Sequence, residues 1–353
     1  MSKAFDRVDH EILCSKLIER GFPNIFVSLI SNWYRNQNVK VSFNGEHSKE
    51  WKITCGVRQG GILSPLLFNV YIDSILNKIS KEKIGCQIGI QKSNIIAYAD
   101  DIVIMAPSMT GLKYLIDVLD EEVNRIKLKI NFNKSECIKF TRQSNQHLID
   151  KFIKIGENNI KFVSEVKYLG YYIDFNLCNE TDIRNNLNSF YKQFNCTLRK
   201  FSKLDSDVLL KLFKTYASQF YGSPLWFRNF KCTKILKQFA VAYHKAIKKI
   251  LKVSYGSSNH DCCEILNLLT FNHFINFSKI RFVYRIFTNC CDFIQSNYMF
   301  LKSNSMILND VNDILKRVYG VNTDLLSNDL DAIQSRIIYI DRREPRSNYI
   351  SIL

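Results

Sequence analysis

Two adjacent aspartates, flanked on both sides by apolar strand-forming residues, constrain this chain more than any other feature. Residues 97–106 read A-Y-A-D-D-I-V-I-M-A, and residues 95–98 and 102–105 favour β structure. The pattern predicts a buried β-hairpin with Asp100 and Asp101 at its tip. Neighbouring carboxylates disfavour each other's ionisation unless they share a cation, and their oxygens suit Mg²⁺. The pair indicates half of a phosphoryl-transfer site, although an ordinary polar turn would give the same letters.

The chain is both rich in apolar residues and strongly basic. Its 353 residues are 46% hydrophobic, with 13 Gly and 5 Pro, which indicates a real core and about two domains. The formal net charge of +16 favours a polyanionic partner, nucleic acid first and an anionic membrane surface second. Residues 198–252 contain 13 basic and two acidic residues, so we expect the phosphate-binding surface there.

The cysteines and the absence of targeting patterns bear on the compartment. None of the 11 Cys stands in C-x-x-C spacing, no secretory signal is seen, and no uncharged apolar run approaches the ~20 residues of a membrane span. We therefore expect reduced thiols in a soluble protein of the cytoplasm and nucleus. His260, Cys262 and Cys263 lack the second spaced pair that a zinc site needs.

A glycine-rich loop precedes a predicted helix in residues 56–73, which read G-V-R-Q-G-G-I-L-S-P-L-L-F-N-V-Y-I-D. Pro65 suits the first helical turn. Glycines let a backbone approach another group closely, and Arg58, Gln59 and Gly60 suit contact with a nucleotide or a nucleic-acid backbone. An ordinary connection between a strand and a helix is the alternative.

The remaining periodicities predict a mixed first half and a helical second half. Helices are expected over 10–20, 24–34 and 109–128, and strands over 39–43 and 51–55 around a turn at Asn44 and Gly45. Residues 129–140 predict a turn and a strand, with Lys134 at the turn, where most lysines are simply solvated. Residues 163–176 predict β structure bent at Gly170, and helices follow from Thr181.

The helical half carries two patterns of interest. One helix is predicted to bury a stripe formed by Leu209, Leu210, Phe213, Tyr216 and Phe220. A second helix carries a basic ridge at i, i+3, i+4 and i+7, formed by Lys245, Lys248, Lys249 and Lys252. A solvated helix face is the alternative for this ridge.

Five blocks in sequence order resemble the reverse transcriptase of a non-LTR (LINE-type) retrotransposon. They are K-A-F-D-R-V-D-H, G-V-R-Q-G-x-x-L-S-P-L-L-F-N, Y-A-D-D, L-K-I-N-F-N-K-S and K-Y-L-G, between Lys3 and Gly170. The resemblance implies an α+β fold: a right-hand polymerase palm, with an antiparallel sheet packed on helices, over residues 1–178. An all-helical thumb over 179–253 and a C-terminal helical connection over 254–353 would follow. It also implies RNA-directed DNA synthesis, with RNA template, DNA primer, RNA/DNA hybrid and dNTP as partners.

The resemblance also implies a role for each matching residue. Asp100 and Asp101 would be catalytic ligands of two Mg²⁺ ions, with Mn²⁺ as the alternative, and Lys134 would protonate the pyrophosphate. Three further groups would contact substrate or nucleic acid. These are Phe5, Arg58, Gln59 and Gly60 around the nucleotide, with Phe5 as steric gate, Tyr168, Leu169 and Gly170 as primer grip, and Lys245, Lys248, Lys249 and Lys252 on the nucleic-acid backbone.

One departure from the family pattern affects the expected activity. The third carboxylate of the family lies five residues before the gate aromatic, a place that falls immediately before Met1, and the upstream finger segments are missing too. Asp6 and Asp9 are the nearby acids, and we expect Asp6 to point elsewhere. We therefore expect this sequence to be an inactive fragment. The alternative is a non-catalytic protein that binds RNA or hybrid, as a domesticated or maturase-like remnant.

Overall fold

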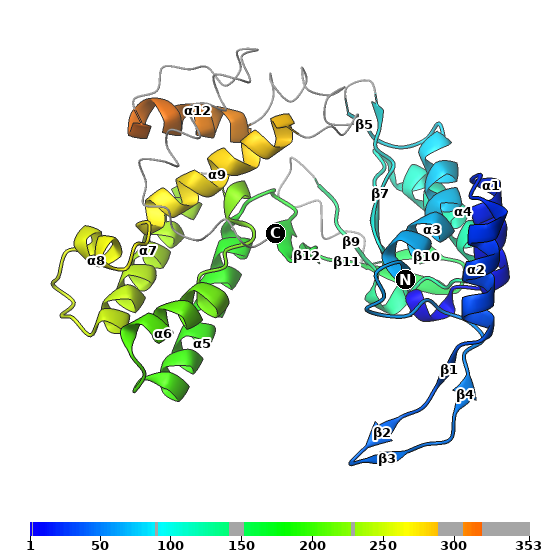
Figure 1. The fold of residues 1–353 in the computed structure, drawn as a ribbon. Coiled ribbons are helices and arrows are strands. Elements are labelled where there is room, and N and C mark those ends of the chain that lie inside the picture. The colour runs from blue at the N-terminus through cyan, green and yellow to red at the C-terminus, as the bar shows by residue number, and fades with distance from the viewer. Residues whose placement is uncertain (2, 89–90, 141–151, 227–229, 289–305, 320–353) are drawn as a thin grey trace. The chain divides into compact units, whose positions relative to one another are not determined.

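The computed structural model describes residues 1, 3–88, 91–140, 152–226, 230–288 and 306–319. Helices and short, mostly antiparallel strand pairs alternate in the first half and helices follow, which gives an α+β protein (Figure 1). The chain divides into two compact units. The first comprises residues 1–137 and 150–162, and the second comprises residues 138–149 and 163–353.

Helices form the core of the first unit, as the periodicity predicts. They are η1 Phe5–Arg7, α1 His10–Glu19, α2 Asn24–Arg35, α3 Ser64–Lys81 and α4 Met109–Arg125. Asp9 caps α1, because its carboxylate accepts from the backbone N–H groups of Glu11 and Ile12 at 3.0 and 3.1 Å. The fully buried Tyr71 of α3 joins two other helices: its hydroxyl donates to the Ile126 carbonyl at 2.6 Å and accepts from Asp9 N at 3.1 Å.

The strands of the first unit form narrow ribbons. β2 Ser42–Phe43 pairs with β3 Glu46–His47 around Asn44 and Gly45, whose φ angles of 50° and 86° suit the predicted turn. β1 Asn38–Val39 pairs further out with β4 Trp51–Lys52. The predicted strand pair is thus interrupted, and this ribbon extends away from the helices of its unit (Figure 1). The other pairs are β5 Gln87–Ile88 with β6 Gln91–Lys92, and β7 Ile95–Tyr98 with β8 Asp101–Ile104.

One hairpin of the first unit was missed by the sequence analysis. β10 Phe152–Ile155 pairs with β11 Asn158–Phe162, and β9 Glu136–Cys137 runs parallel beside β11. The alternating residues F-I-K-I, followed by Gly156, are the sequence signal that could have revealed it; the structure buries Ile153 and Ile155 and gives Gly156 a φ of 54°. The strand predicted within 129–140 is reduced to β9, because η2 Phe132–Lys134 takes up the preceding residues.

The second unit begins with a hairpin and continues as helices, as predicted. Its elements are β12 Glu165–Tyr168, β13 Tyr171–Asp174, α5 Glu180–Phe201, α6 Ser206–Leu212, the π turn η4 Phe213–Ala217, η5 Ser223–Leu225, α7 Phe230–Leu251, α8 Asn259–Ile265, α9 Phe271–Thr288 and α12 Met306–Tyr319. An aromatic cluster fills its core. The cluster includes Phe190, Phe194, Phe213, Phe220, Trp226, Phe239, Tyr243 and Phe271.

The predicted apolar stripe from Leu209 to Phe220 is wrong at one position. Leu209, Phe213 and Phe220 are buried, but Tyr216 is 60% exposed. In η4 the Ser218 N–H donates to the Phe213 carbonyl five residues back, so the turn is wider than an α-helical turn. This extra residue shifts the buried face to Ala217 and turns Tyr216 outward.

The predicted C-terminal region and the predicted lack of membrane spans remain to be compared with the structure. Of the region predicted as a C-terminal connection, residues 289–305 and 320–353 lie outside the described residues. Within the described part of the chain, no helix has the length and apolar character needed to cross a membrane.

Candidate functional site

The aspartate pair lies on a short hairpin of the first unit. In the β7–β8 register Tyr98 faces Asp101, so Ala99 and Asp100 form the two-residue turn and Asp101 begins the second strand. Ala99 has a φ of 51°, in the left-handed region that costs a residue with a Cβ. The prediction of a hairpin is confirmed, but it is not buried on both faces. Ile96 is 47% and Tyr98 is 65% exposed, while Ile95, Ile102 and Ile104 pack on the core.

The N-terminal segment contacts this turn directly. The Met1 amino group donates to the carbonyl oxygen of Asp100 at 2.9 Å. Four residues later, the Phe5 ring stacks on the fully buried Phe68 of α3, with ring centroids 4.6 Å apart. The buried Ala4 and Val8 flank Phe5 and anchor the segment in the core. The position of Phe5 is therefore fixed relative to the turn by a few well-packed residues.

The glycine-rich loop lies against the same N-terminal segment. Two backbone hydrogen bonds join them, from Gly56 N to the Val8 carbonyl at 2.8 Å and from Val57 N to the Phe5 carbonyl at 2.7 Å. A Cβ at Gly56 would lie 3.0 Å from the Asp6 backbone, and the φ of Gly56 is 96°, so only glycine fits this crossing.

The polar residues of the loop are held in defined positions. The Gln59 amide donates to the Asp6 carboxylate at 3.2 Å, and the Arg58 carbonyl accepts from the Ser64 hydroxyl at 2.5 Å. Gly60 follows with a φ of 81°, and all three predicted loop residues are exposed. The structure thus joins Gln59, and the loop that carries Arg58 and Gly60, to the N-terminal segment of Phe5, which also contacts Asp100.

Lys134 lies apart from the contacts between the N-terminal segment, the glycine-rich loop and the Asp100 turn. It is the last residue of η2, and its side chain is exposed. Among the described residues, no hydrogen bond or ion pair joins its ammonium group to Asp100 or Asp101. Its role in the site stays a prediction.

The two acids nearest to Phe5 are both engaged elsewhere. Asp6 accepts from Gln59, as described above, and Asp9 caps α1 and pairs with Lys127 at 2.7 Å. Burial raises the pKa of Asp9, but the hydrogen bonds from Lys127 and the helix N–H groups outweigh burial, so the pKa lies below its usual value. Asp9 is therefore a structural anion at a helix start, and Asp6 positions a loop amide.

The second unit carries the other predicted residues. Leu169 and Gly170 form the two-residue turn of the β12–β13 hairpin, with φ angles of 47° and 84°, and Tyr168 and Tyr171 pair across it. Lys245 and Lys249 of α7 are exposed, as is Lys252 directly after its end, but the expectation of a four-lysine ridge is wrong for Lys248. Lys248 is buried because its ammonium group donates to the Tyr255 carbonyl at 2.9 Å.

The donor chemistry of the hairpin suits a hard divalent cation. Mg²⁺ in phosphoryl-transfer sites is held by one or two carboxylates, with water and substrate phosphates completing its shell. Asp100 and Asp101 supply two carboxylates at solvent-accessible positions of one turn. Among the described residues, no group of three or more His, Cys, Asp or Glu side chains is arranged to hold a metal ion.

Residues 1–173, which include every first-unit residue discussed above, match the family model described as reverse transcriptase (RNA-dependent DNA polymerase). Residues 1–173 belong to the reverse transcriptase family. The type-2 retrotransposable element R2DM of Drosophila melanogaster encodes a retrovirus-related Pol polyprotein that is 33% identical over 176 residues, 48% of this chain and 17% of that protein. The RNA-directed DNA polymerase from mobile element jockey of Drosophila funebris is 26% identical over 239 residues, 63% of this chain and 25% of that protein.

These relatives specify the type of reverse transcriptase. The Xenopus laevis transposon TX1 149 kDa protein is a further relative, 25% identical over 232 residues. The resemblance to the LINE type, drawn from the five ordered blocks, is confirmed. The chain spans about a sixth to a quarter of the length of these three relatives. The matched family model describes RNA-dependent DNA polymerases.

Proposed function

We propose that residues 1–178 are the palm of an RNA-directed DNA polymerase that transfers dNTPs to a primer 3′-hydroxyl on an RNA template. The observation that carries the proposal is the segment from Met1 to Phe5. It contacts the Asp100 turn at one end and the glycine-rich loop at the other. A helical thumb over 179–253 and a connection over 254–353 complete the proposed division.

The chain's own residues divide the work of the reaction. Asp100 and Asp101 would hold the cation, with Mg²⁺ as the natural ion and Mn²⁺ as a substitute. Mg²⁺ at this place would increase the nucleophilicity of the 3′-hydroxyl and offset the charge of the leaving pyrophosphate. Lys134 supplies a proton to that pyrophosphate. Phe5, stacked on Phe68 and unable to retreat, limits the space beside the sugar of the nucleotide.

The loop and the second unit provide the contacts to nucleic acid. Gln59, positioned by Asp6, contacts the incoming nucleotide together with Arg58 and Gly60. The β12–β13 turn, with Tyr168, Leu169 and Gly170, holds the primer. Exposed lysines of α7 contact the phosphates of the RNA/DNA hybrid.

Primer extension on an RNA template tests the proposal and its third carboxylate. In the family, an aspartate occupies the position before Met1. The contact between Met1 and Asp100 supports a location of that aspartate beside Asp100 and Asp101. We compare residues 1–353 with the Asp-preceded polypeptide, the same chain preceded by Met-Asp. We expect Mg²⁺-dependent extension only from the Asp-preceded polypeptide, because loss of one ligand costs several powers of ten in rate.

Either of two results would contradict this proposal. Robust extension by residues 1–353 alone would show that the third carboxylate is unnecessary. Absence of extension by both polypeptides would show that residues 1–353, even with the third carboxylate added, are not sufficient for DNA synthesis.

A non-catalytic protein that binds RNA or hybrid is the second candidate, and the basic α7 surface favours it. Lys245 and Lys249 are exposed on this helix and Lys252 is exposed just after its last residue, with no acidic residue between them in the sequence. Under this candidate, RNA affinity would be the same in the wild-type protein and the Asp100→Asn variant, and neither polypeptide described above would extend a primer.

Replacing Lys245, Lys249 and Lys252 together by alanine tests the phosphate-binding role of α7. Each phosphate contact contributes about 0.7–0.9 to the slope of log affinity against log salt. We therefore expect the slope for RNA binding to fall by about 2–3 in the triple variant. The matched control replaces Lys81, Lys83 and Lys113, which are exposed lysines of the first unit. An unchanged slope in the α7 variant, or an equal change in the control, would contradict the assignment.

A further inference from the structure

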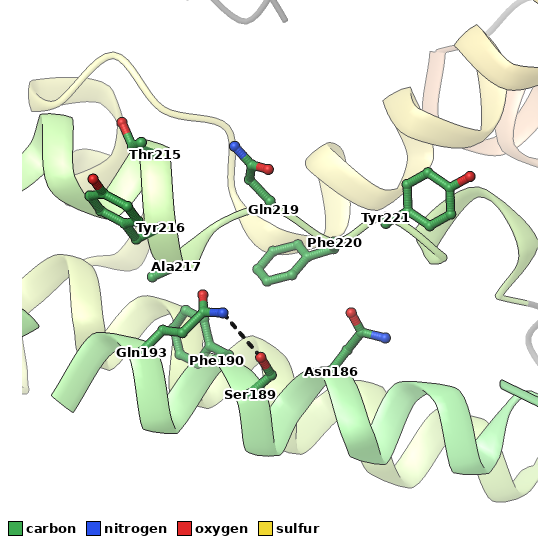
Figure 2. Close-up of a pocket in the computed structure, with 10 residues that line it drawn as sticks. All are labelled: Asn186, Ser189, Phe190, Gln193, Thr215, Tyr216, Ala217, Gln219, Phe220 and Tyr221. Carbon is green, nitrogen blue, oxygen red and sulfur yellow. Dashed lines mark hydrogen bonds between the residues drawn. The ribbon is translucent and has the colours of Figure 1, made fainter. Parts of the chain in front are cut away.

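A pocket of about 350 Å³ lies in the second unit between α5 and the segment 215–221 (Figure 2). This volume falls within the ~300–1,000 Å³ range of small-molecule sites. Figure 2 shows α5 side chains facing the segment, with Phe190 and Phe220 between them. These two rings belong to the buried aromatic core, with centroids 6.0 Å apart, so the floor of the pocket is apolar and firmly packed.

The rim of the pocket consists of neutral hydrogen-bonding groups. None of the ten lining residues is charged, so the pocket itself does not suit a phosphate or a cation. The Asn186 amide nitrogen donates to the Asp182 backbone carbonyl at 2.9 Å, so its nitrogen already has a partner while its oxygen is an acceptor. Gln219 is exposed and makes no hydrogen bond to the described residues, so both its donor and its acceptor are open to a ligand.

Two exposed tyrosines stand at opposite ends of the segment that lines the pocket. Tyr216 is 60% and Tyr221 is 73% exposed, and the wide turn of η4 is what turns Tyr216 outward. π turns are frequent at functional sites. An aromatic face beside open amides suits a planar group that stacks and hydrogen-bonds along its edge, and an unpaired nucleobase is such a group.

The surroundings of the pocket favour a nucleic acid as the source of that base. Lys192 is adjacent to Gln193 in α5, and Lys211 lies one helical turn before Thr215; both are exposed and suited to phosphates beside the base. Tyr221 also packs against the β12–β13 turn, because a Cβ at Gly170 would lie 3.7 Å from its ring. The pocket therefore adjoins the turn assigned to the primer.

We propose that this pocket binds one unpaired nucleobase of a single-stranded nucleic acid, stacked on Tyr216 or Tyr221 and hydrogen-bonded by Gln219 and Asn186. The inference rests on the proposed function only in requiring a nucleic-acid partner. Stacking explains the exposed tyrosines, and the uncharged rim explains why the base, and not its phosphate, enters the pocket.

Fluorescence of 2-aminopurine in a single-stranded oligonucleotide tests this site in the full chain. Stacking on tyrosine quenches the fluorophore, and loss of a stacking partner weakens single-strand binding by about 5- to 150-fold. We expect that weakening and a loss of quenching in Tyr216→Leu, Tyr221→Leu or the double variant. Tyr→Phe at the same position is expected to restore both, because the ring is retained. The matched control is Tyr191→Leu, an exposed α5 tyrosine that does not line the pocket.

The other results separate the site from the proposed function. RNA and DNA strands of the same sequence are tested separately. Equal quenching by the two strands would show that the pocket recognises the base alone. Quenching of only one strand would show that the pocket also contacts the sugar. Wild-type binding and quenching in the double tyrosine variant would overturn the pocket while leaving RNA-directed synthesis intact. Equal quenching with a 2-aminopurine held in a duplex would overturn it too. Failure of the wild-type chain to bind any strand would overturn both proposals.

Discussion

We expect the Asp100→Asn substitution in the Asp-preceded polypeptide to lower the rate of primer extension by several powers of ten while the first unit stays folded. Asparagine keeps the size of the side chain but removes the negative charge that would hold the cation. The fold should tolerate it, because the turn uses the Asp100 backbone carbonyl, which accepts from Met1. Single-turnover extension rates and circular dichroism measure the two effects separately.

Asp117→Asn is the matched control for Asp100→Asn. Asp117 is an exposed aspartate of α4, and its substitution makes the same change in charge within the same unit. We expect it to leave the rate within about twofold of the unsubstituted polypeptide, since surface changes of this kind have small effects. An Asp100→Asn variant that extends primers as fast as the control would contradict the metal role of Asp100.

The second large effect is expected at Asp182, a fully buried carboxylate at the start of α5. It accepts from the Trp226 indole N–H at 2.7 Å, from Tyr172 N at 3.1 Å and from the Asn186 amide at 3.2 Å. Alanine at this position leaves these donors without their acceptor, so we expect Asp182→Ala to lower the free energy of unfolding by about 3–5 kcal/mol. Chemical denaturation followed by tryptophan fluorescence measures the loss.

The pH dependence of this effect has a definite sign. Burial raises the pKa of Asp182, and the hydrogen bonds from Trp226 and Tyr172 only partly offset it. The stability that this raised pKa gives to the folded protein is fully present at pH values below the pKa of the carboxyl in the unfolded chain. It is lost as pH rises through the pKa of the carboxyl in the folded protein.

The matched control is Asp207→Ala, at an exposed position of α6. We expect it to lower the free energy of unfolding by under about 1 kcal/mol throughout this pH range. An equal loss in both variants would contradict the role of Asp182.

The sequence predicted the parts of the fold whose local pattern and packing agree. The helices α1 to α4 follow their apolar periodicity, and the hairpin at Asp100 follows from apolar runs on both sides of the aspartates. The sequence could not show that one face of this hairpin is exposed. Its apolar runs are continuous, and the number of buried faces depends on which helices pack against the strands.

The errors have specific physical causes. Tyr216 left the predicted stripe because a single wide turn changed the helical register, which period counting cannot detect. Lys248 left the predicted ridge because its ammonium group donates a hydrogen bond to the Tyr255 carbonyl, seven residues later. The contact between Asp6 and Gln59 joins residues 53 positions apart, so no local pattern indicated it. The order of five motifs predicted the family, although no single motif did.

Iron-directed backbone cleavage tests the central claim, a cation held by Asp100 and Asp101, most directly. Fe²⁺ replaces Mg²⁺ in the Asp-preceded polypeptide, and ascorbate with peroxide then cuts the chain close to the bound ion. We predict cuts within a few residues of Asp100 and near Met1, suppressed by excess Mg²⁺ and lost when Asp100 and Asp101 are both replaced by asparagine. Cuts that are confined to other regions, or that persist unchanged in the double variant, would contradict the claim.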